Sequence, residues 1–369
     1  MLATRSIRAW LSAGAGALAV MACGGGDDGM SGNGMSYAPS ILVSDTAGAA
    51  NPYGNSAHVD SNLINAWGIA FNPQGFVWVA NAGTSTSTLY DGNGVPQSLV
   101  VTVPPGIARE AAPTGIVFNA SPGFQVTQGG LTGASAFIFA GQAGTISGWS
   151  PAVNLNNAIT SVDRSAVGAI YKGLAHATQG GADFLYASDF HNGAVDVFDS
   201  TFTKVTAAGA FADANLPSGY APFGIQAIGN LIYVSFAKQD AQAEDEVAGA
   251  GLGAVDVFDT SGVLVKRLVA VGGRLNAPWG MAMAPADFGP FSSALLVANF
   301  GDGKINAFDP TTGAFLGTLS RSDGSAIAID GLWGIAFGNG LNAQPTNTLF
   351  FTAGPGGEAH GVYGRIDNR

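Results

Sequence analysis

A short motif that recurs along the whole chain constrains the fold more than any other feature of the sequence. Its clearest copy is Asn276–Ala284, in which a bulky residue precedes a glycine and a short apolar run follows it. The glycines of the six copies are Gly68, Gly115, Gly173, Gly224, Gly280 and Gly334. They recur every 47 to 58 residues, and each interval is long enough for four short strands and their turns. Six such units predict a six-bladed β-propeller.

Each unit contains the same series of predicted strands. In the fifth unit the strand after the glycine is followed by three more: Leu295–Ala298, Lys304–Asp309 and Ala314–Leu319. Apolar and polar residues alternate in the third strands, as in Val255–Asp259, which is typical of a strand with one face in water. The predicted fold class is therefore all-β, with four-stranded antiparallel blades.

In this prediction the two ends of the chain complete the last blade together. The sixth unit ends after its third strand, Gly361–Ile366, and its missing outer strand is available at Ser40–Ser44. Pairing of the two segments closes the ring and removes the free sheet edges that an open array exposes. We therefore predict one propeller domain over residues 39–367, closed by an N-terminal strand.

The first residues are typical of a targeting segment. Two arginines precede an apolar run, Ala9–Ala22, which is too short to cross a bilayer as a helix. The run ends at Cys23, the only cysteine, in a pattern that resembles a bacterial lipoprotein signal. We predict a lipoprotein signal peptide over residues 1–22, lipidation of Cys23 and a flexible Gly-rich tether over residues 23–38. An ordinary secretory signal that happens to hold a cysteine remains the alternative.

The targeting segment and the charge together limit location and partners. The protein is predicted to be exported and lipid-anchored to the bacterial envelope, facing the periplasm or the cell surface, and otherwise periplasmic or secreted. The formal net charge is −11, and an acidic surface repels phosphate backbones, so we expect no nucleic-acid partner. Membrane contact is expected only through the Cys23 anchor, and the protein is expected to be a monomer.

Several of these segments also carry a resemblance to a known family. The closing strand Ser40–Ser44, the stretch Asn65–Ala70 and the stretch Phe223–Gly229 resemble a bacterial conserved-hypothetical family of six-bladed propellers in the NHL/YWTD/TolB-like group. The resemblance covers the chain from about Pro39 to Ile366. It implies the same propeller fold, and it brings no assigned reaction and no catalytic residues.

Polar side chains gather at one predicted end of the channel, because the first strand of a blade starts where its second strand ends. They follow the second strands of five units: Asn81, Asp189, Ser235, Asn299 and Thr352. Ca²⁺ prefers such oxygen ligands, and Asp189, Asn299 and Asp302 are the candidate metal ligands. The alternative, which we favour, is that these residues cap strand ends and bond unpaired backbone groups.

Large aromatic residues precede the repeat glycines at the same predicted channel mouth. They are Trp67, Phe223, Trp279 and Trp333. Such rings stack on a sugar or line a hydrophobic pocket in some proteins, but we favour the interpretation that they fill gaps between blades. The acidic loop Lys238–Val247 has three possible interpretations: a loop that folds over this mouth, a cation-binding loop, or a mobile, solvated loop. We favour the last of these.

The motifs that are absent limit the function. Neither G-x-S-x-G nor H-E-x-x-H occurs, so no nucleophile or metalloprotease signature is present. We predict an exported, lipid-anchored binding or interaction module for an unknown protein, glycan or small-molecule ligand. The alternative is a calcium-assisted hydrolase or lactonase at the channel mouth, with Asp189 and Asn299 as Ca²⁺ ligands and His191 as the base. Whether the protein is an enzyme is left open, and no cofactor other than Ca²⁺ is indicated.

Overall fold

The computed structural model describes residues 36–47 and 55–369, which form an almost all-β structure. The helix in this part of the chain is a single 3-10 turn, Ser165–Val167. Within the same residues, no helix is long and apolar enough to cross a membrane. The predicted signal peptide, Cys23 and most of the predicted tether lie outside the described residues.

Six antiparallel sheets follow one another along the chain and form the blades. Blade 1 consists of β3 (Ala66–Phe71), β4 (Val77–Asn81), β5 (Thr86–Tyr90) and β6 (Pro96–Thr102). Blade 2 consists of β7 (Pro113–Phe118), β10 (Phe137–Gly141), β11 (Thr145–Trp149) and β12 (Ile159–Asp163). Blade 3 consists of β13 (Tyr171–Gln179), β14 (Ala182–Asp189) and β15 (Ala194–Asp199).

The second half of the chain forms the other three blades. Blade 4 consists of β16 (Tyr220–Ile228), β17 (Leu231–Lys238), β18 (Gly253–Asp259) and β19 (Leu264–Val269). Blade 5 consists of β20 (Pro278–Met283), β21 (Leu295–Asn299), β22 (Ile305–Phe308) and β23 (Phe315–Thr318). Blade 6 consists of β24 (Leu332–Phe337), β25 (Leu349–Ala353), β26 (Val362–Asn368), β1 (Tyr37–Ser44) and the short β2 (His58–Val59).

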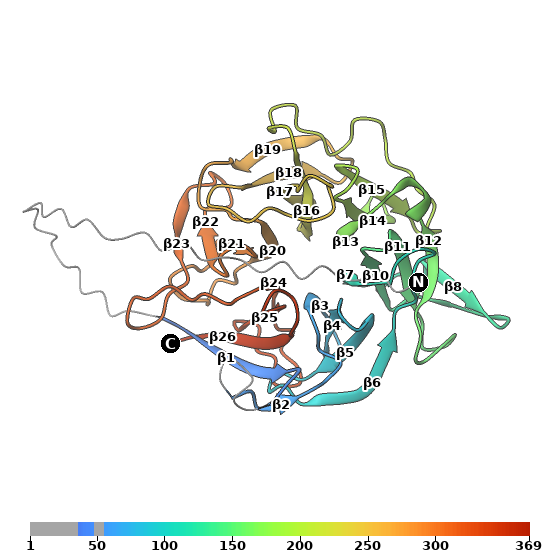
Figure 1. Ribbon diagram of the computed structural model, residues 1–369, viewed down its shortest axis with the longest axis horizontal. Helices are drawn as coiled ribbons and strands as arrows, with labels where there is room; N and C mark the ends of the chain where they lie inside the picture. The colour runs from blue at the N-terminus through green and yellow to red at the C-terminus, as the bar shows by residue number, and fades with distance from the viewer. Residues whose placement is uncertain (1–35, 48–54) are drawn as a thin grey trace, which may run out of the picture. The chain divides into compact units, whose positions relative to one another are not determined.

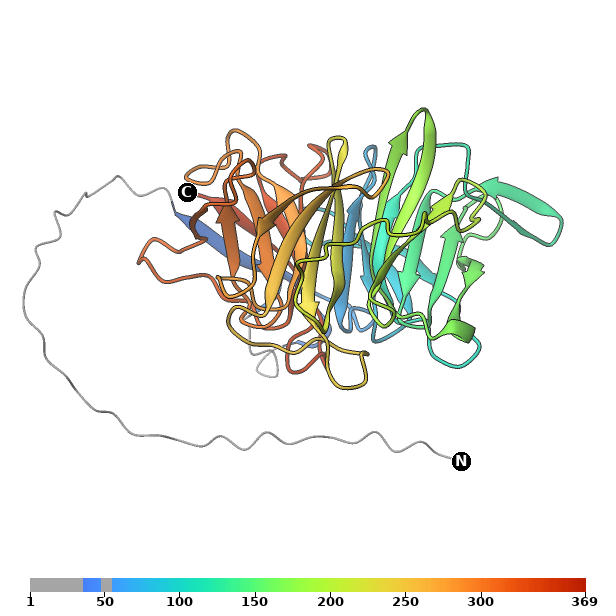
Figure 2. The same cartoon turned by 90° about the horizontal axis from the view of Figure 1, so that it is seen from above.

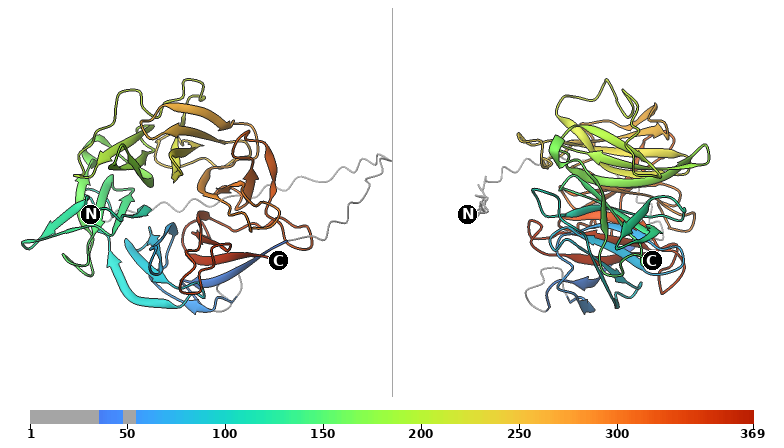
Figure 3. Two further views of the ribbon diagram at one scale, coloured as in Figure 1. Left: turned by 180° about the vertical axis from the view of Figure 1, so that it is seen from behind. Right: turned by 90° about the vertical axis from the view of Figure 1, so that its right-hand side faces the viewer.

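The first strand of every blade lies nearest the axis, and these six inner strands form a closed ring (Figures 1 and 3). Each inner strand contacts the next, from β3 through β7, β13, β16 and β20 to β24, and β24 contacts β3 again. This closed ring confirms the predicted six-bladed β-propeller.

The repeat glycines allow the inner strands to approach one another closely. A Cβ atom on Gly280 would lie 2.5 Å from the carbonyl oxygen of Trp333 in the next blade. A Cβ atom on Gly68 would lie 2.4 Å from the carbonyl oxygen of Thr114, again in the next blade. These distances are too short for any side chain, so the motif requires glycine wherever one inner strand meets the next. The recurring motif is therefore a packing device.

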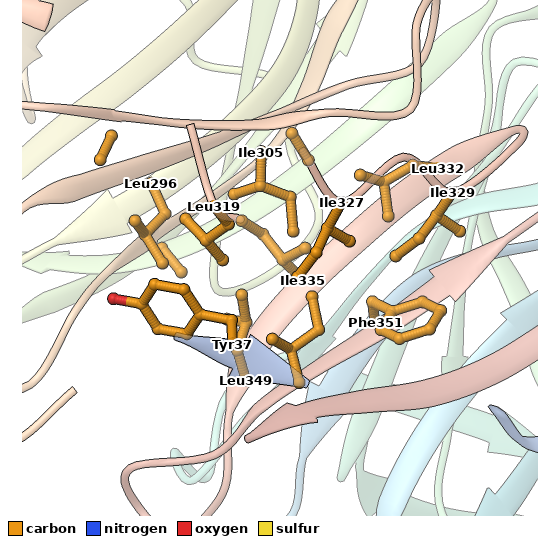
Figure 4. Packing of buried hydrophobic residues seen from close by; sticks show 14 of the residues in the cluster. Tyr37, Leu296, Ile305, Leu319, Ile327, Ile329, Leu332, Ile335, Leu349 and Phe351 are labelled. Atoms are coloured by element: carbon orange, nitrogen blue, oxygen red, sulfur yellow. The ribbon is translucent and has the colours of Figure 1, made fainter. Parts of the chain in front are cut away.

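Strand β1 supplies the outer strand of blade 6, as predicted. It pairs antiparallel with β26 along nearly its whole length. Its first residue, Tyr37, is buried in the core between blades 5 and 6, together with residues such as Leu296 and Phe351 (Figure 4). The Tyr37 hydroxyl donates to the carbonyl oxygen of Phe288 at 3.1 Å. The N-terminal strand therefore joins the two ends of the propeller through both backbone pairing and core packing.

Two features depart from the pattern of four-stranded blades. Blade 3 has three full strands, and only a short segment pairs with β15, where the Val205 amide donates to the Val197 carbonyl oxygen at 2.8 Å. Blade 2 carries an extra hairpin of β8 (Gln125–Gln128) and β9 (Leu131–Ala134), which projects from the ring (Figure 2). β8 contacts β11 and β12, the two strands of blade 2 that lie farthest from the axis. In blade 3 the short segment pairs with β15, the strand farthest from the axis. Both departures therefore lie away from the axis, and all six inner strands still surround the channel.

Candidate functional site

The central channel has two different ends, which the direction of the inner strands defines. The residues before the repeat glycines lie at one end, here called the mouth, and the last residues of the inner strands lie at the other, here called the opening. Aromatic and charged side chains fill the mouth. At the opening the channel holds a cavity of about 450 Å³.

Five aromatic side chains, here called the aromatic plug, pack together at the mouth. They are Trp67, Phe223, Trp279, Phe300 and Trp333. Trp67 and Phe300 stack on Trp333, with ring centroids 3.7 and 3.9 Å apart. Trp279 meets both Trp67 and Trp333 edge-on. The rings therefore pack against one another as well as filling gaps between blades, and they close the channel at this end.

A buried lysine lies beside the aromatic plug. Lys172 comes from the start of β13 and is 0% exposed. Its Nζ atom lies 5.2 Å from the centroid of the Trp67 ring and 5.8 Å from that of Phe190, within the range of cation–π attraction. Nζ also donates a hydrogen bond to Asp245 at 2.9 Å. Aromatic faces and a carboxylate therefore replace water around this ammonium group.

Two further carboxyl groups lie close to Lys172. A Glu246 oxygen is 3.9 Å from the lysine Nζ, and Glu358 accepts a hydrogen bond from the Asn65 side chain at 2.6 Å. Burial raises the pKa of Glu246 to about 8, although Lys172 lowers it. Burial alone would lower the pKa of Lys172, but Glu246 and Asp245 raise it overall. Lys172 therefore keeps its charge beside its hydrogen-bond partner Asp245, whereas burial favours the protonated form of Glu246.

The loop between β17 and β18, here called the lid loop, covers the mouth and provides two acidic partners of Lys172. The sequence favoured a mobile, solvated loop at Lys238–Val247, whereas the structure shows a loop bonded to the mouth. Its Gln239 side chain donates to the Phe190 carbonyl oxygen at 2.6 Å. His191, the candidate base, donates to a backbone carbonyl of the loop at 3.2 Å. The buried Lys172 ammonium group is stable only beside polar partners, so its contacts with the acidic residues of this loop hold the loop in place.

Three of the polar residues predicted at the mouth bond to neighbouring groups of the protein. The Ser235 hydroxyl donates to the Pro278 carbonyl oxygen at 2.6 Å, and the Thr352 hydroxyl donates to the Trp67 carbonyl oxygen at 2.5 Å. The Asn81 side chain donates to two threonines of its own blade, at 3.0 and 3.1 Å. All three side chains are buried. Ser235 and Thr352 therefore link one blade to the next, in line with the favoured capping interpretation.

The candidate calcium ligands lie in two different blades. Asp189, in blade 3, accepts hydrogen bonds from the backbone amides of Ile170 and Asn192, each at 3.2 Å. In blade 5, Asn299 donates to Asp302 at 3.1 Å. Within the described parts of the chain, no group of three or more histidines, cysteines or carboxylates is placed to hold a metal ion. Ca²⁺ takes roughly six to eight oxygen ligands. The donor set falls short of that number, and the calcium site stays a prediction.

Residues of all six inner strands line the cavity at the opening. The residues directly after the repeat glycines form its inner ring: Ile69, Ile116, Leu174, Ile225, Met281 and Ile335. A narrower extension continues from this ring toward Trp279 and the repeat glycines. Ligand pockets typically span about 300 to 1,000 Å³. The cavity therefore has the size of a small-molecule site.

Sequence reasoning missed the two polar residues in the cavity wall, Gln226 and His176. Burial lowers the pKa of His176, although Asp183 raises it, so the ring is neutral at neutral pH. The signal was present, because the other five copies of the motif carry apolar residues at each of these two positions. Glu246 and Glu358 had no such signal, because they lie on loops that do not repeat.

Comparison with solved structures shows the fold. A protein of unknown function from Bacteroides thetaiotaomicron gives a TM-score of 0.53 at 11% identity, covering 91% of this chain and 76% of that chain. A catalytically inactive virginiamycin B lyase from Staphylococcus aureus, in a structure with quinupristin, gives a TM-score of 0.50 at 12% identity, covering 90% of this chain and 99% of that chain. At such low identity the likeness is evidence for the propeller fold alone.

Sequence comparison finds relatives of this chain among the proteins of a virus. No family model matches the sequence. Uncharacterized protein R648 of Acanthamoeba polyphaga mimivirus is 35% identical over 328 residues, covering 86% of this chain and 78% of that protein. Uncharacterized protein L690 of the same virus is 32% identical over 292 residues, covering 76% of this chain and 75% of that protein. These relatives do not support the bacterial origin that the resemblance implied. The chain belongs to the protein family that includes these two mimivirus proteins.

Proposed function

We propose that the protein is an exported, lipid-anchored binding module that takes a small ligand into its central channel through the opening. The observation that carries this proposal is the cavity of about 450 Å³, to which every blade contributes its inner strand. The aromatic plug closes the other end of the channel. A pocket closed at one end surrounds most of the surface of a small ligand, which favours binding.

The composition of the cavity wall favours binding over catalysis. Its side chains are aliphatic, aromatic or thioether groups, with Gln226 and His176 as the polar exceptions. No serine, cysteine or carboxylate lines the cavity in the described structure. The wall therefore offers no activated nucleophile and no acid–base pair. The calcium-assisted hydrolase remains a separate proposal, because its candidate residues lie at the mouth.

Export and anchoring are supported by the sequence alone, because the predicted signal and Cys23 lie outside the described residues. The test is a Cys23→Ser variant in a host that processes bacterial lipoproteins. The parent protein should partition into the detergent phase of a Triton X-114 extract, and the variant should stay in the aqueous phase. Equal partitioning of the two proteins would contradict lipidation.

Titration with N-phenyl-1-naphthylamine, an uncharged apolar fluorophore, tests binding in the channel. Its fluorescence should rise and saturate when each chain holds a single molecule. Gln226→Trp places a large ring inside the cavity and should abolish the signal. Val265→Trp, at an exposed position of the outer strand β19, is the matched control and should bind like the parent. Absence of binding by the parent, or equal binding by both variants, would overturn the proposal.

A further inference from the structure

One inner strand differs from the other five at the second residue after the repeat glycine. The residues at this position are Ala70, Val117, Ala175, Gln226, Ala282 and Ala336. Five blades therefore place a small apolar side chain in the channel wall, and blade 4 places an amide there. The repeat does not need a polar group at this position, so Gln226 requires a separate explanation.

Gln226 is presented to the cavity and not to the protein interior. It is exposed although it lies on the inner strand β16, and it lines both the main cavity and its narrow extension. Its amide nitrogen makes a long contact of 3.4 Å with the carbonyl oxygen of Ala227. Among the described residues its Oε1 atom has no hydrogen-bond partner. The amide is therefore available to a molecule in the channel.

The rest of the wall carries no charge that would compensate a charged ligand. The lining residues of the cavity include no lysine, arginine, aspartate or glutamate. His176 is neutral at neutral pH, because burial lowers its pKa. An ion that entered the cavity would lose hydration without gaining a counter-charge, which is strongly unfavourable. The net charge of −11 disfavours anions further.

We propose that the channel selects an uncharged ligand with a hydrogen-bonding group, and that the Gln226 amide pairs with this group as the specificity-determining residue. The inference rests on the proposed function, because it assumes that a ligand occupies the channel. The inner strands enclose the cavity from every blade, whereas the amide contributes orientation from one blade. A ligand is therefore held with its polar group toward blade 4.

A matched pair of fluorophores tests the charge requirement. N-phenyl-1-naphthylamine and 8-anilinonaphthalene-1-sulfonate share one ring system and one N–H donor, and they differ by a sulfonate group. The parent protein should bind the neutral probe at least about tenfold more tightly, because the sulfonate has no partner in the wall. Gln226→Lys supplies that partner and should reverse the preference.

Gln226→Met tests the hydrogen bond, because methionine has a similar length and no amide. The affinity for N-phenyl-1-naphthylamine should fall about 3- to 10-fold, the usual net effect of a neutral hydrogen bond. Gln97→Met is the control, since Gln97 lies on the outer strand β6 and its amide also bonds only to a nearby backbone carbonyl. The control should bind like the parent.

The outcomes separate this inference from the proposed function. If the parent binds both probes equally, or if Gln226→Met binds the neutral probe like the parent, the ligand class is wrong. In that case a block by Gln226→Trp would still support binding in the channel. If the parent binds neither probe, both the channel proposal and the ligand class are overturned.

Discussion

The free energy of unfolding should depend on pH because the Glu246 side chain is buried at the channel mouth. Burial raises the pKa of this carboxyl from its ordinary value of 4.5 to about 8 in the folded chain. Between these two pH values the folded chain keeps a proton that the unfolded chain has released, so stability falls as pH rises. Each pH unit within the window lowers the free energy of unfolding by about 1.4 kcal/mol. The total loss is on the order of a few kcal/mol.

Glu246→Gln removes this titration and keeps the shape of the side chain. Near pH 5 the variant and the parent should be nearly equally stable, because both side chains are neutral in the folded state. Near pH 9 the variant should be more stable by roughly a few kcal/mol. Lys172 keeps its partner Asp245 at 2.9 Å, so the variant does not leave the lysine unpaired. Glu244→Gln, at a half-exposed position of the same loop, should follow the parent at every pH.

Urea unfolding, followed by tryptophan fluorescence at constant ionic strength, measures the difference between variant and parent from pH 5 to pH 9. Other groups titrate in this range, such as Asp256, whose pKa is raised to about 6, mainly by burial. Their contributions are common to both proteins and cancel in the difference. A difference that stays constant across the range would refute the inference that Glu246 is buried and protonated.

Three other perturbations test the ring, its closure and the calcium hypothesis. Thr352→Val removes the hydroxyl that bonds the Trp67 carbonyl and the Gly334 amide, and it should lower the free energy of unfolding by about 1 to 3 kcal/mol. An unchanged urea midpoint would contradict the bridging role. Tyr37→Ala removes a buried ring from the closing strand and should cost roughly 3 to 5 kcal/mol, more than Tyr37→Phe does in the same assay; equal losses would argue against core packing. With the donor set seen here we expect EDTA and Ca²⁺ to leave the Tm unchanged, and a calcium-dependent rise that Asp189→Ala abolishes would support the hydrolase instead.

The fold was predictable from the sequence because its signals are local and repeated. The motif around Gly280 recurs in every blade, since every inner strand must pass close to the backbone of the next. The closing strand was predictable as well, because the sixth unit lacked an outer strand and Ser40–Ser44 could supply one. Blade 3 was harder to predict, because the failure of its fourth strand depends on how the segment near Val205 packs.

The site was less predictable, because it arises from contacts between distant segments. Lys172 occupies a repeat position, but its partners Glu246 and Glu358 come from loops of blades 4 and 6. No pattern in the sequence joins three residues so far apart. Gln226 could have been found, because it breaks the repeat at a position where the other blades are apolar. The differences between the copies of the motif therefore carry more information about the channel than any single copy does.

The most direct test of ligand binding in the channel is a crystal structure of the protein with an iodinated N-phenyl-1-naphthylamine, with the iodine located by its anomalous scattering. If the ligand binds in the channel, one strong peak is expected within the ring of inner strands, between Gln226 and the aliphatic residues that follow the repeat glycines. A peak at the mouth or on an outer strand, or no peak at all, at a concentration that saturates the fluorescence, would contradict binding in the channel.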